Sequence, residues 1–128
     1  MNEFRYLLDT NVLIDVLGDA RSGATMRLGE CRRGTVAVSA ISYAETLLGL
    51  SRRGPDAVER ARALFDLVEV LAFDRDAAAA YAELPFRRGS YDRLIAAHAR
   101  ALNLVLVTNN VRDFADVPGL RIENWAEA

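Results

Sequence analysis

Residues 5–17 read RYLLDTNVLIDVL, and this stretch indicates the class of fold. It begins with a short apolar run, residues 5–8, that ends at Asp9, as expected of a buried strand. In residues 11–17 the apolar side chains recur at helical spacing, so the stretch predicts a strand, a turn and a helix. Asp9 lies at the turn, where it is either a functional carboxylate or an ordinary helix N-cap.

The alternation of short strands and helices continues along the chain. Apolar runs at residues 36–38, 68–73 and 104–107 predict further buried strands, with residues 120–122 as an edge strand. Strands of this kind, separated by helices, predict an α/β fold with a parallel sheet covered on both faces. The helices expected between them are residues 23–33, a helix capped by Ser39 or Ser42 that ends near Arg53 before Gly54-Pro55, one that includes residues 58–65, an alanine-rich one from Asp74 to near Pro85, and one capped by Ser90 over residues 91–102.

The size and composition of the chain narrow its class. Its 128 residues are expected to form one domain, residues 1–128, and an apolar fraction of 52% leaves hydrophobic surface for an oligomer. The single cysteine, Cys31, excludes an internal disulfide and indicates a reducing compartment. No run approaches the length of a membrane-spanning helix. We therefore expect a cytoplasmic protein that does not enter a membrane.

The charge balance excludes a protein that coats nucleic acid. The net charge of -2 provides no general attraction to a polyanion, so any contact with nucleic acid must be local. Every basic residue is an arginine, which suits phosphate contacts but is equally explained by a codon-biased genome.

Two aspartates are expected at the ligand-binding end of the sheet. In open parallel sheets this site lies beyond the carboxyl ends of the strands, where Asp9 and residues 108–110 are found. Asp92 begins a helix, and the residues three, four and seven positions later are apolar, which directs its side chain toward the core side. An acid in a first turn also complements the helix dipole without any further role.

A third carboxylate makes a metal site the better interpretation. Glu45 lies mid-helix on the same face as Ile41 and Leu48, and a buried carboxylate needs a partner or a metal. Three carboxylates near one crevice repel one another unless a cation neutralises them, and oxygen ligands select Mg²⁺ or Mn²⁺. Because Mg²⁺ keeps several waters and binds substrate phosphate, this ligand set suits phosphodiester hydrolysis.

Other catalytic classes are excluded by counting residues. His98 is the single histidine, whereas a metal-free ribonuclease with a histidine acid and a histidine base needs two. A Ser/His/Asp triad would also depend on His98, and the chain has neither a Gly-x-Ser-x-Gly elbow nor a glycine-rich phosphate loop ending in Lys. His98 follows Asp92 by six positions, which places it on another side of the helix as a packed or surface residue. Cys31 is expected to be an inert thiol.

Several motifs occur together in one order. They are LDTN (residues 8–11), YAE (43–45), DRLIAAHA (92–99) and VTNN (107–110), followed by DF (113–114) and ENW (123–125). In this order and spacing, over nearly the full length, the chain resembles the PIN-domain VapC toxins. The resemblance implies a three-layer α/β/α sandwich with a short, mostly parallel sheet. It also implies a homodimeric, metal-dependent endoribonuclease that is the toxin of a type II toxin-antitoxin pair and inhibits translation.

The resemblance implies roles for individual acids. Asp9, Glu45 and Asp92 match the acidic metal-binding set of the family, and the fourth family acid falls at Asn110. The amide of Asn110 still offers a neutral oxygen or a hydrogen bond, and Asp113 nearby is expected to supply the missing charge. In the resulting hypothesis Asp9 and Asp92 hold one Mg²⁺, or Mn²⁺ in its place, and Glu45 orients the attacking water or binds a second ion.

Neighbouring residues are assigned supporting roles. The hydroxyls of Thr10 and Thr108 are expected to hydrogen-bond to the metal ligands. Arg87, Arg88 and Arg93 flank the predicted Asp92 loop, where an RNA backbone is expected to approach, although each arginine taken singly is also explained as solvated surface.

The substrate class and the partner also follow from the resemblance. Structured RNA is expected, often tRNA, with single-stranded loops as reasonable targets because their bases can splay out. A cognate antitoxin is expected to cover surplus apolar surface, with residues 46–53 as one candidate surface, and to place a basic side chain over the carboxylates.

Two other functions remain open at the level of sequence. One is a catalytically inactive PIN-like module that binds protein or RNA, in which the acids only cap helices and Asn110 marks a degraded site. The other is a phosphatase that forms a phospho-aspartate, but that chemistry needs a second aspartate two positions after Asp9, where Asn11 stands.

Overall fold

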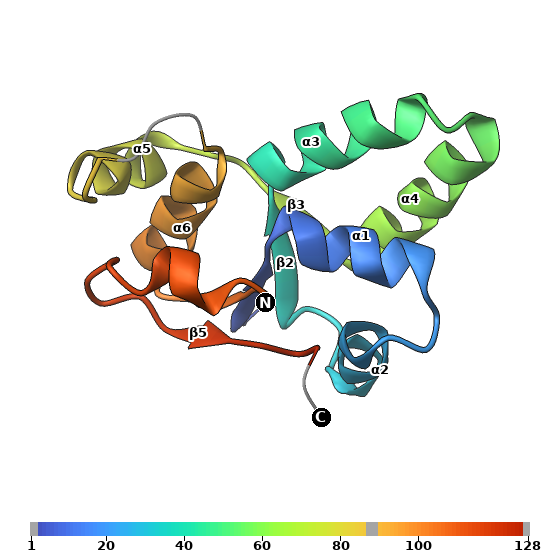
Figure 1. The fold of residues 1–128 in the computed structure, drawn as a ribbon, viewed down its shortest axis with the longest axis horizontal. Helices are drawn as coiled ribbons and strands as arrows, with labels where there is room; N and C mark the ends of the chain where they lie inside the picture. The colour runs from blue at the N-terminus through green and yellow to red at the C-terminus, as the bar shows by residue number, and fades with distance from the viewer. Residues whose placement is uncertain (1–2, 87–89, 127–128) are drawn as a thin grey trace.

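A five-stranded parallel sheet forms the centre of the protein (Figure 1). The structure, a computed structural model, describes residues 3–86 and 90–126. In the described part of the chain every strand pairing is parallel, so the sheet predicted as mostly parallel is fully parallel there. The strands are β1 (Tyr6–Leu8), β2 (Val36–Ser39), β3 (Glu69–Leu71), β4 (Val105–Val107) and β5 (Ile122–Glu123), in the order β3-β2-β1-β4-β5.

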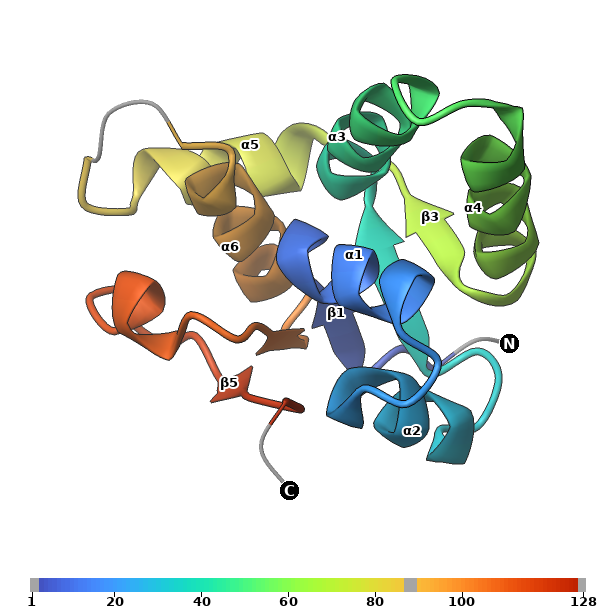
Figure 2. The same cartoon turned by 45° about the vertical axis from the view of Figure 1, so that its right-hand side comes forward.

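Helices cover both faces of this sheet, which confirms the predicted three-layer α/β/α sandwich. In Figure 1, α5 and α6 lie on one side of the strands and α1, α2 and α4 on the other, and Figure 2 again shows α5 and α6 on the left and α4 on the right. Helix α3 follows β2 and packs against α4. The helices are α1 (Thr10–Gly18), α2 (Gly23–Glu30), α3 (Ala40–Ser51), α4 (Pro55–Leu67), α5 (Arg75–Ala82) and α6 (Asp92–Ala101), with a 3-10 turn η1 (Val111–Phe114) before β5.

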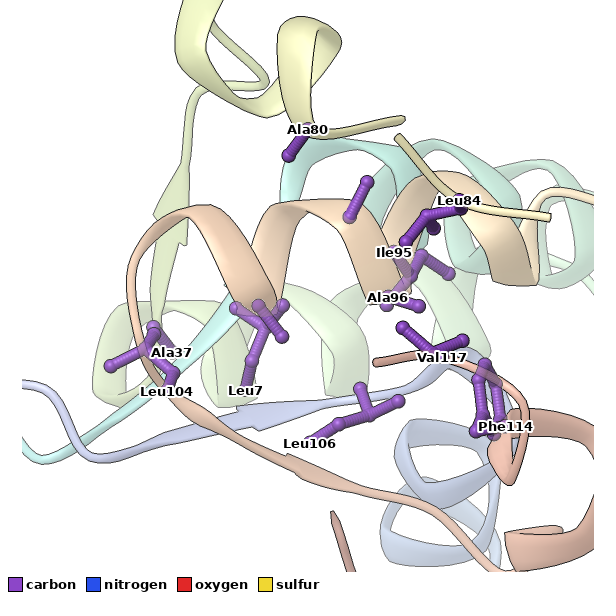
Figure 3. Close-up of a cluster of buried hydrophobic side chains, with 12 residues drawn as sticks. Leu7, Ala37, Ala80, Leu84, Ile95, Ala96, Leu104, Leu106, Phe114 and Val117 are labelled. Carbon is purple, nitrogen blue, oxygen red and sulfur yellow. The ribbon is translucent and has the colours of Figure 1, made fainter. Parts of the chain in front are cut away.

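Alternate residues of the central strands fill the two cores. Leu7 and Leu106 point to the face covered by α5 and α6, as Figure 3 shows. Their neighbours Leu8 and Val107 point to the opposite face, covered by α1, α2 and α4. All four side chains are fully buried, and each contributes about 1.5–3 kcal/mol to folding. Continuous apolar strands are therefore required, because both faces of the sheet are covered.

The residues that begin the helices match the predicted caps. Asp9, Asp74 and Ser39 each accept a hydrogen bond from a backbone N–H in the first turn of the helix that follows. Of the two candidate serines, Ser39 is the cap, whereas Ser42 is buried inside α3. Gly54 has a φ of 99°, a conformation that glycine adopts without strain, and it separates α3 from α4 as predicted.

Some predicted boundaries are wrong by a few residues. The helix expected over residues 23–33 ends at Glu30, because the chain turns back before β2, where the Thr35 N–H donates to the Arg32 carbonyl at 3.2 Å. Cys31 is therefore the C-cap of α2 and not part of the helix. Strand β3 is shorter than residues 68–73, and β5 lies two residues beyond the predicted start at residue 120. None of the described helices is long and apolar enough to cross a membrane.

Candidate active site

The direction in which the chain adds strands to the sheet changes at β1. From β1 the chain continues to β2 and β3 on one side, and β4 then lies on the other side of β1. At such a switch point the connections leave in opposite directions, and ligands bind beyond the carboxyl ends of the two strands. Asp9 directly follows β1, and Thr108 directly follows β4. Asp9 and Thr108 therefore lie at the carboxyl ends of neighbouring strands, as the sequence predicted.

Asp9 is a buried carboxylate with a raised pKa. Its side chain is 2% exposed, and it accepts a hydrogen bond from the Val12 amide at 2.9 Å. Burial raises the pKa of Asp9 to about 6, hydrogen bonds from Thr108 and Val12 oppose the shift, and the charges of Asp92 and Asp15 add to it. Asp9 is therefore the N-cap of α1 and also an acid whose negative charge no cationic side chain of residues 3–86 and 90–126 neutralises in an ion pair.

Asp92 lies in the first turn of α6, near enough to Asp9 for its charge to raise the pKa of Asp9. The residues that place its helix, Ile95, Ala96 and Ala99, are fully buried as predicted. Burial raises the pKa of Asp92, and the charge of Asp113 raises it further. Ser90 stabilises the start of the helix, because its hydroxyl accepts a hydrogen bond from the Asp92 amide at 3.0 Å.

Glu45 is hydrogen-bonded to Thr10, the residue that follows Asp9. The Thr10 hydroxyl, one residue after Asp9, donates to Glu45 Oε1 at 2.8 Å, which joins the first turn of α1 to the middle of α3. The prediction that Glu45 shares a core face with Leu48 is wrong, because Leu48 is 61% exposed. The buried residues of α3 are Ser42, Thr46 and Leu50, and Glu45 is half-buried beside them.

Two further acids, Asp113 after β4 and Asp15 on α1, accept hydrogen bonds from the loop after β4. The Asn110 side chain donates to the Asp113 carboxylate. The backbone N–H of Asn110 donates to the Thr108 hydroxyl at 3.0 Å. Asn109 reaches across to α1, where it donates to Asp15 at 2.6 Å. The sequence interpretation missed Asp15. Its position six residues after Asp9 carries no helical-face signal, and only the pairing of β1 with β4 brings it to this loop.

The donor chemistry of the site fits a hard divalent cation. In residues 3–86 and 90–126 no arginine forms an ion pair with Asp9, Asp92 or Glu45. Uncompensated carboxylate oxygens are the ligands that Mg²⁺ and Mn²⁺ select. Within those same residues, no three acidic, histidine or cysteine side chains are already arranged closely enough to enclose an ion. Binding would therefore have to draw the carboxylates together.

The expected contact of Arg93 with RNA is wrong. Its side chain is 3% exposed, and its guanidinium donates to both carboxylate oxygens of Asp116 at 2.8 and 2.9 Å. A buried guanidinium must be paired, so Arg93 holds η1 and the chain after it against α6. Arg87 and Arg88, also predicted to contact RNA, lie outside the described residues.

Breaking the ion pair between Arg93 and Asp116 should destabilise the fold and leave the binding of RNA unchanged. Asp116→Asn removes the charge that compensates buried Arg93, and we expect the free energy of unfolding to fall by about 2 kcal/mol, less than for a fully buried pair because Asp116 is partly exposed. Urea unfolding measures this change, with Asp66→Asn, an exposed acid on α4, as the matched control. An equal loss in both variants would contradict a specific role of the pair.

The two residues excluded from catalysis are found in structural positions. His98 is 1% exposed and packs edge-to-face on Phe73, so it is a packed histidine as predicted. Burial raises the pKa of the Cys31 thiol, which keeps it protonated, and its Sγ donates to the Arg27 carbonyl at 3.4 Å.

Comparison with known proteins identifies the class that this fold and site define. The family model described as "PIN domain" matches residues 6–120. The tRNA(fMet)-specific endonuclease VapC of Shigella flexneri is 32% identical, over 95% of this chain and 98% of its own length. Ribonuclease VapC2 of Rickettsia felis is 31% identical, over 94% of this chain and 97% of its own. The crystal structure of VapBC2 from Rickettsia felis, bound to a DNA fragment from its promoter, superposes with a TM-score of 0.86 at 28% identity, covering 96% of this chain and 99% of that one.

The chain belongs to the PIN-domain family, and within it to the VapC ribonucleases, the toxins of VapBC toxin-antitoxin systems. The family prediction made from the motifs is thereby confirmed.

Proposed function

We propose that this VapC endoribonuclease depends on Mg²⁺, cleaves structured RNA with tRNA as the first candidate, and thereby inhibits translation in the cytoplasm. The observation that carries the proposal is the pair of aspartates at the switch point of the sheet: burial raises the pKa of both Asp9 and Asp92, and the charge of Asp92 raises the pKa of Asp9 further. Two relatives named as tRNA(fMet)-specific endonucleases, at 32% and 33% identity, support tRNA as the substrate.

Each residue of the site has a distinct task in this proposal. When bound, Mg²⁺ supplies an activated water and neutralises charge on the scissile phosphate. Asp9 and Asp92 are the carboxylates that would hold the cation, and Asp113 would add negative charge beside Asp92. Glu45 accepts a hydrogen bond from the Thr10 hydroxyl at Oε1, and its second carboxylate oxygen would orient the water.

The hydroxyl of Thr108 and the amide of Asn110 support these groups. Thr108 is fully buried. Its hydroxyl hydrogen-bonds to Asp9 and accepts a hydrogen bond from the backbone N–H of Asn110. It therefore fixes the loop after β4 against the carboxylate that follows β1. Asn110 in turn orients the Asp113 carboxylate.

Cleavage of RNA by the purified chain, freed of antitoxin, tests the proposal. We expect discrete fragments of total bacterial RNA with Mg²⁺ or Mn²⁺ and none with EDTA. Intact RNA under all three conditions would favour the inactive binding module, for which the amide at Asn110 is the one supporting feature.

A groove between α1, α3 and α4 is the surface that we propose for the cognate antitoxin. Solved relatives are toxin-antitoxin complexes, which supports a partner of this kind. The groove is lined by apolar side chains that include Ile14, Leu17 and Leu50, and it overlaps the predicted surface at residues 46–53. Glu45 also lines it, so a bound segment reaches the carboxylates and can present a basic side chain to them.

Gly49 provides a direct test of this groove. A Cβ at Gly49 meets no other atom, so Gly49→Arg is tolerated by the fold but projects into the groove. We expect its affinity for the antitoxin to fall by about 100-fold, because a desolvated charge replaces apolar contact. Isothermal titration calorimetry measures the change. Gly29→Arg on α2, a helical glycine with equally open surroundings, is the control and should bind normally.

We also propose a homodimer. Several large apolar side chains are exposed, among them Phe86 at 83% and Tyr91 at 61%, and association would remove such surface from water. Light scattering of the purified toxin tests this, and a monomer at all concentrations would contradict it.

A further inference from the structure

His98 connects three elements that lead to the active site. Its Nδ1 lies 2.8 Å from the hydroxyl of Ser39, and its ring also hydrogen-bonds to the backbone of Ala72. Ser39 ends β2 and begins α3, and Ala72 directly follows β3. His98 itself lies on α6, the helix that carries Asp92.

The directions of these hydrogen bonds follow from the groups involved. The Ser39 hydroxyl oxygen accepts from the Ile41 amide at 3.1 Å as the cap of α3, which leaves its own proton to donate. The backbone carbonyl of Ala72 can only accept, so we assign the donor and the ring proton to Nε2, the nitrogen that Ser39 does not engage. Nδ1 is then unprotonated and accepts from Ser39. We call this chain of hydrogen bonds, from Ser39 through His98 to Ala72, the His98 relay. When the imidazole is neutral, each of its two ring nitrogens has a hydrogen-bond partner in the relay.

The surroundings of His98 keep the ring neutral and fixed. Burial lowers the pKa of His98, although the charge of Asp74 opposes this shift. The ring of Phe73 contacts it edge-to-face, with centroids 5.4 Å apart. Both His98 and Ser39 are at most 1% exposed, so the hydrogen bond between them is shielded from water.

We infer that His98 is a positioning residue, which through Ser39 fixes the start of α3, with Glu45, relative to α6, with Asp92. This inference rests on the proposed nuclease function. Asp92 and Glu45 lie on different helices and share no hydrogen bond in the described part of the chain. The His98–Ser39 contact is a direct side-chain link between the helix that carries Asp92 and the cap of the helix that carries Glu45.

Two substitutions of His98 test the hydrogen bonds of its two ring nitrogens one at a time. His98→Asn keeps an acceptor at the position of Nδ1, and His98→Gln keeps a donor at the position of Nε2. We expect His98→Gln and Ser39→Ala to lower kcat about tenfold, with KM for RNA changed less than twofold, because the carboxylates are displaced while RNA contacts are not. His98→Asn should retain most of the activity. If His98→Asn and His98→Gln are equally impaired, the contact with Ser39 does not position the site.

A core variant controls for simple loss of stability. Val68→Ala removes buried methyl groups on the opposite face of the sheet, in the core beneath α4, and should lower the melting temperature without lowering kcat when the protein is fully folded. If Val68→Ala lowers kcat as much as Ser39→Ala at the same loss of stability, the positioning role is wrong.

Nuclear magnetic resonance tests the relay without RNA or metal. Because the chain has a single histidine, the ring nitrogen signals belong to His98 without ambiguity. We expect a neutral ring with the proton on Nε2, and in Ser39→Ala we expect the amide signals of residues 92–95 to shift together with those of residues 41–46. If the wild type cleaves no RNA, the proposed function fails, and the amide signals then decide alone: unchanged signals at residues 92–95 would overturn the coupling, and a proton on Nδ1 would overturn the assigned directions.

Discussion

Asp92→Asn is expected to abolish RNA cleavage while the fold remains intact. The loss of kcat should be on the order of a thousandfold, since a metal-binding carboxylate contributes several kcal/mol to the stabilisation of the transition state. The melting temperature should stay similar or rise, because burial and the charge of Asp113 already disfavour the ionised form of Asp92. Single-turnover cleavage and thermal unfolding measure the two effects.

An exposed aspartate in the first turn of another helix serves as the control. Asp56 lies in the first turn of α4 and is exposed, so Asp56→Asn changes the same functional group without touching the site. It should cleave RNA at the wild-type rate. If Asp92→Asn unfolds the protein instead, Asp92 is a structural residue and the inactive binding module becomes the better interpretation.

Asp9→Asn is expected to stabilise the metal-free protein at neutral pH. The folded-state pKa of Asp9 is raised from 3.8 to about 6, so the stability associated with its protonated form is fully present below pH 3.8 and is lost as the pH rises through 6. This shift corresponds to about 3 kcal/mol, counted as an upper value. The asparagine keeps the cap acceptor for Val12 and carries no charge. The free energy of unfolding of Asp9→Asn should therefore exceed that of the wild type only slightly near pH 4 and by the full amount at pH 7.5.

Added Mg²⁺ should reverse this difference. A cation bound at this site would neutralise Asp9 in the folded wild type, so the melting temperature at pH 7.5 should rise with Mg²⁺ and fall again with EDTA. Asp9→Asn should respond far less. Chemical unfolding at pH 4, 6 and 7.5, with and without Mg²⁺, checks both statements, and an identical response of the two proteins would argue against Asp9 as a ligand.

Much of the fold was predictable because its signals are local. The strand before Asp9, the cap at Asp74 and the break at Gly54-Pro55 depend on neighbouring residues only, and all three are confirmed. Helix ends were harder to predict, because the end of α2 at Glu30 depends on how the chain must turn to enter β2. The face of Glu45 was assigned wrongly for a related reason. Helical spacing alone did not show that α3 buries Ser42, Thr46 and Leu50 instead of Leu48.

The sequence by itself determined the family, the alternation of strands and helices, and the candidate acids Asp9, Glu45 and Asp92, since these depend on residue type and spacing along one chain. Only the tertiary structure decided which side chains face one another. It buried Arg93 against Asp116, brought Asp15 to the loop after β4, and joined His98 to Ser39, 59 residues away. The physical reason is that contacts across a parallel sheet are set by strand order and register, which leave no periodic signal in the sequence.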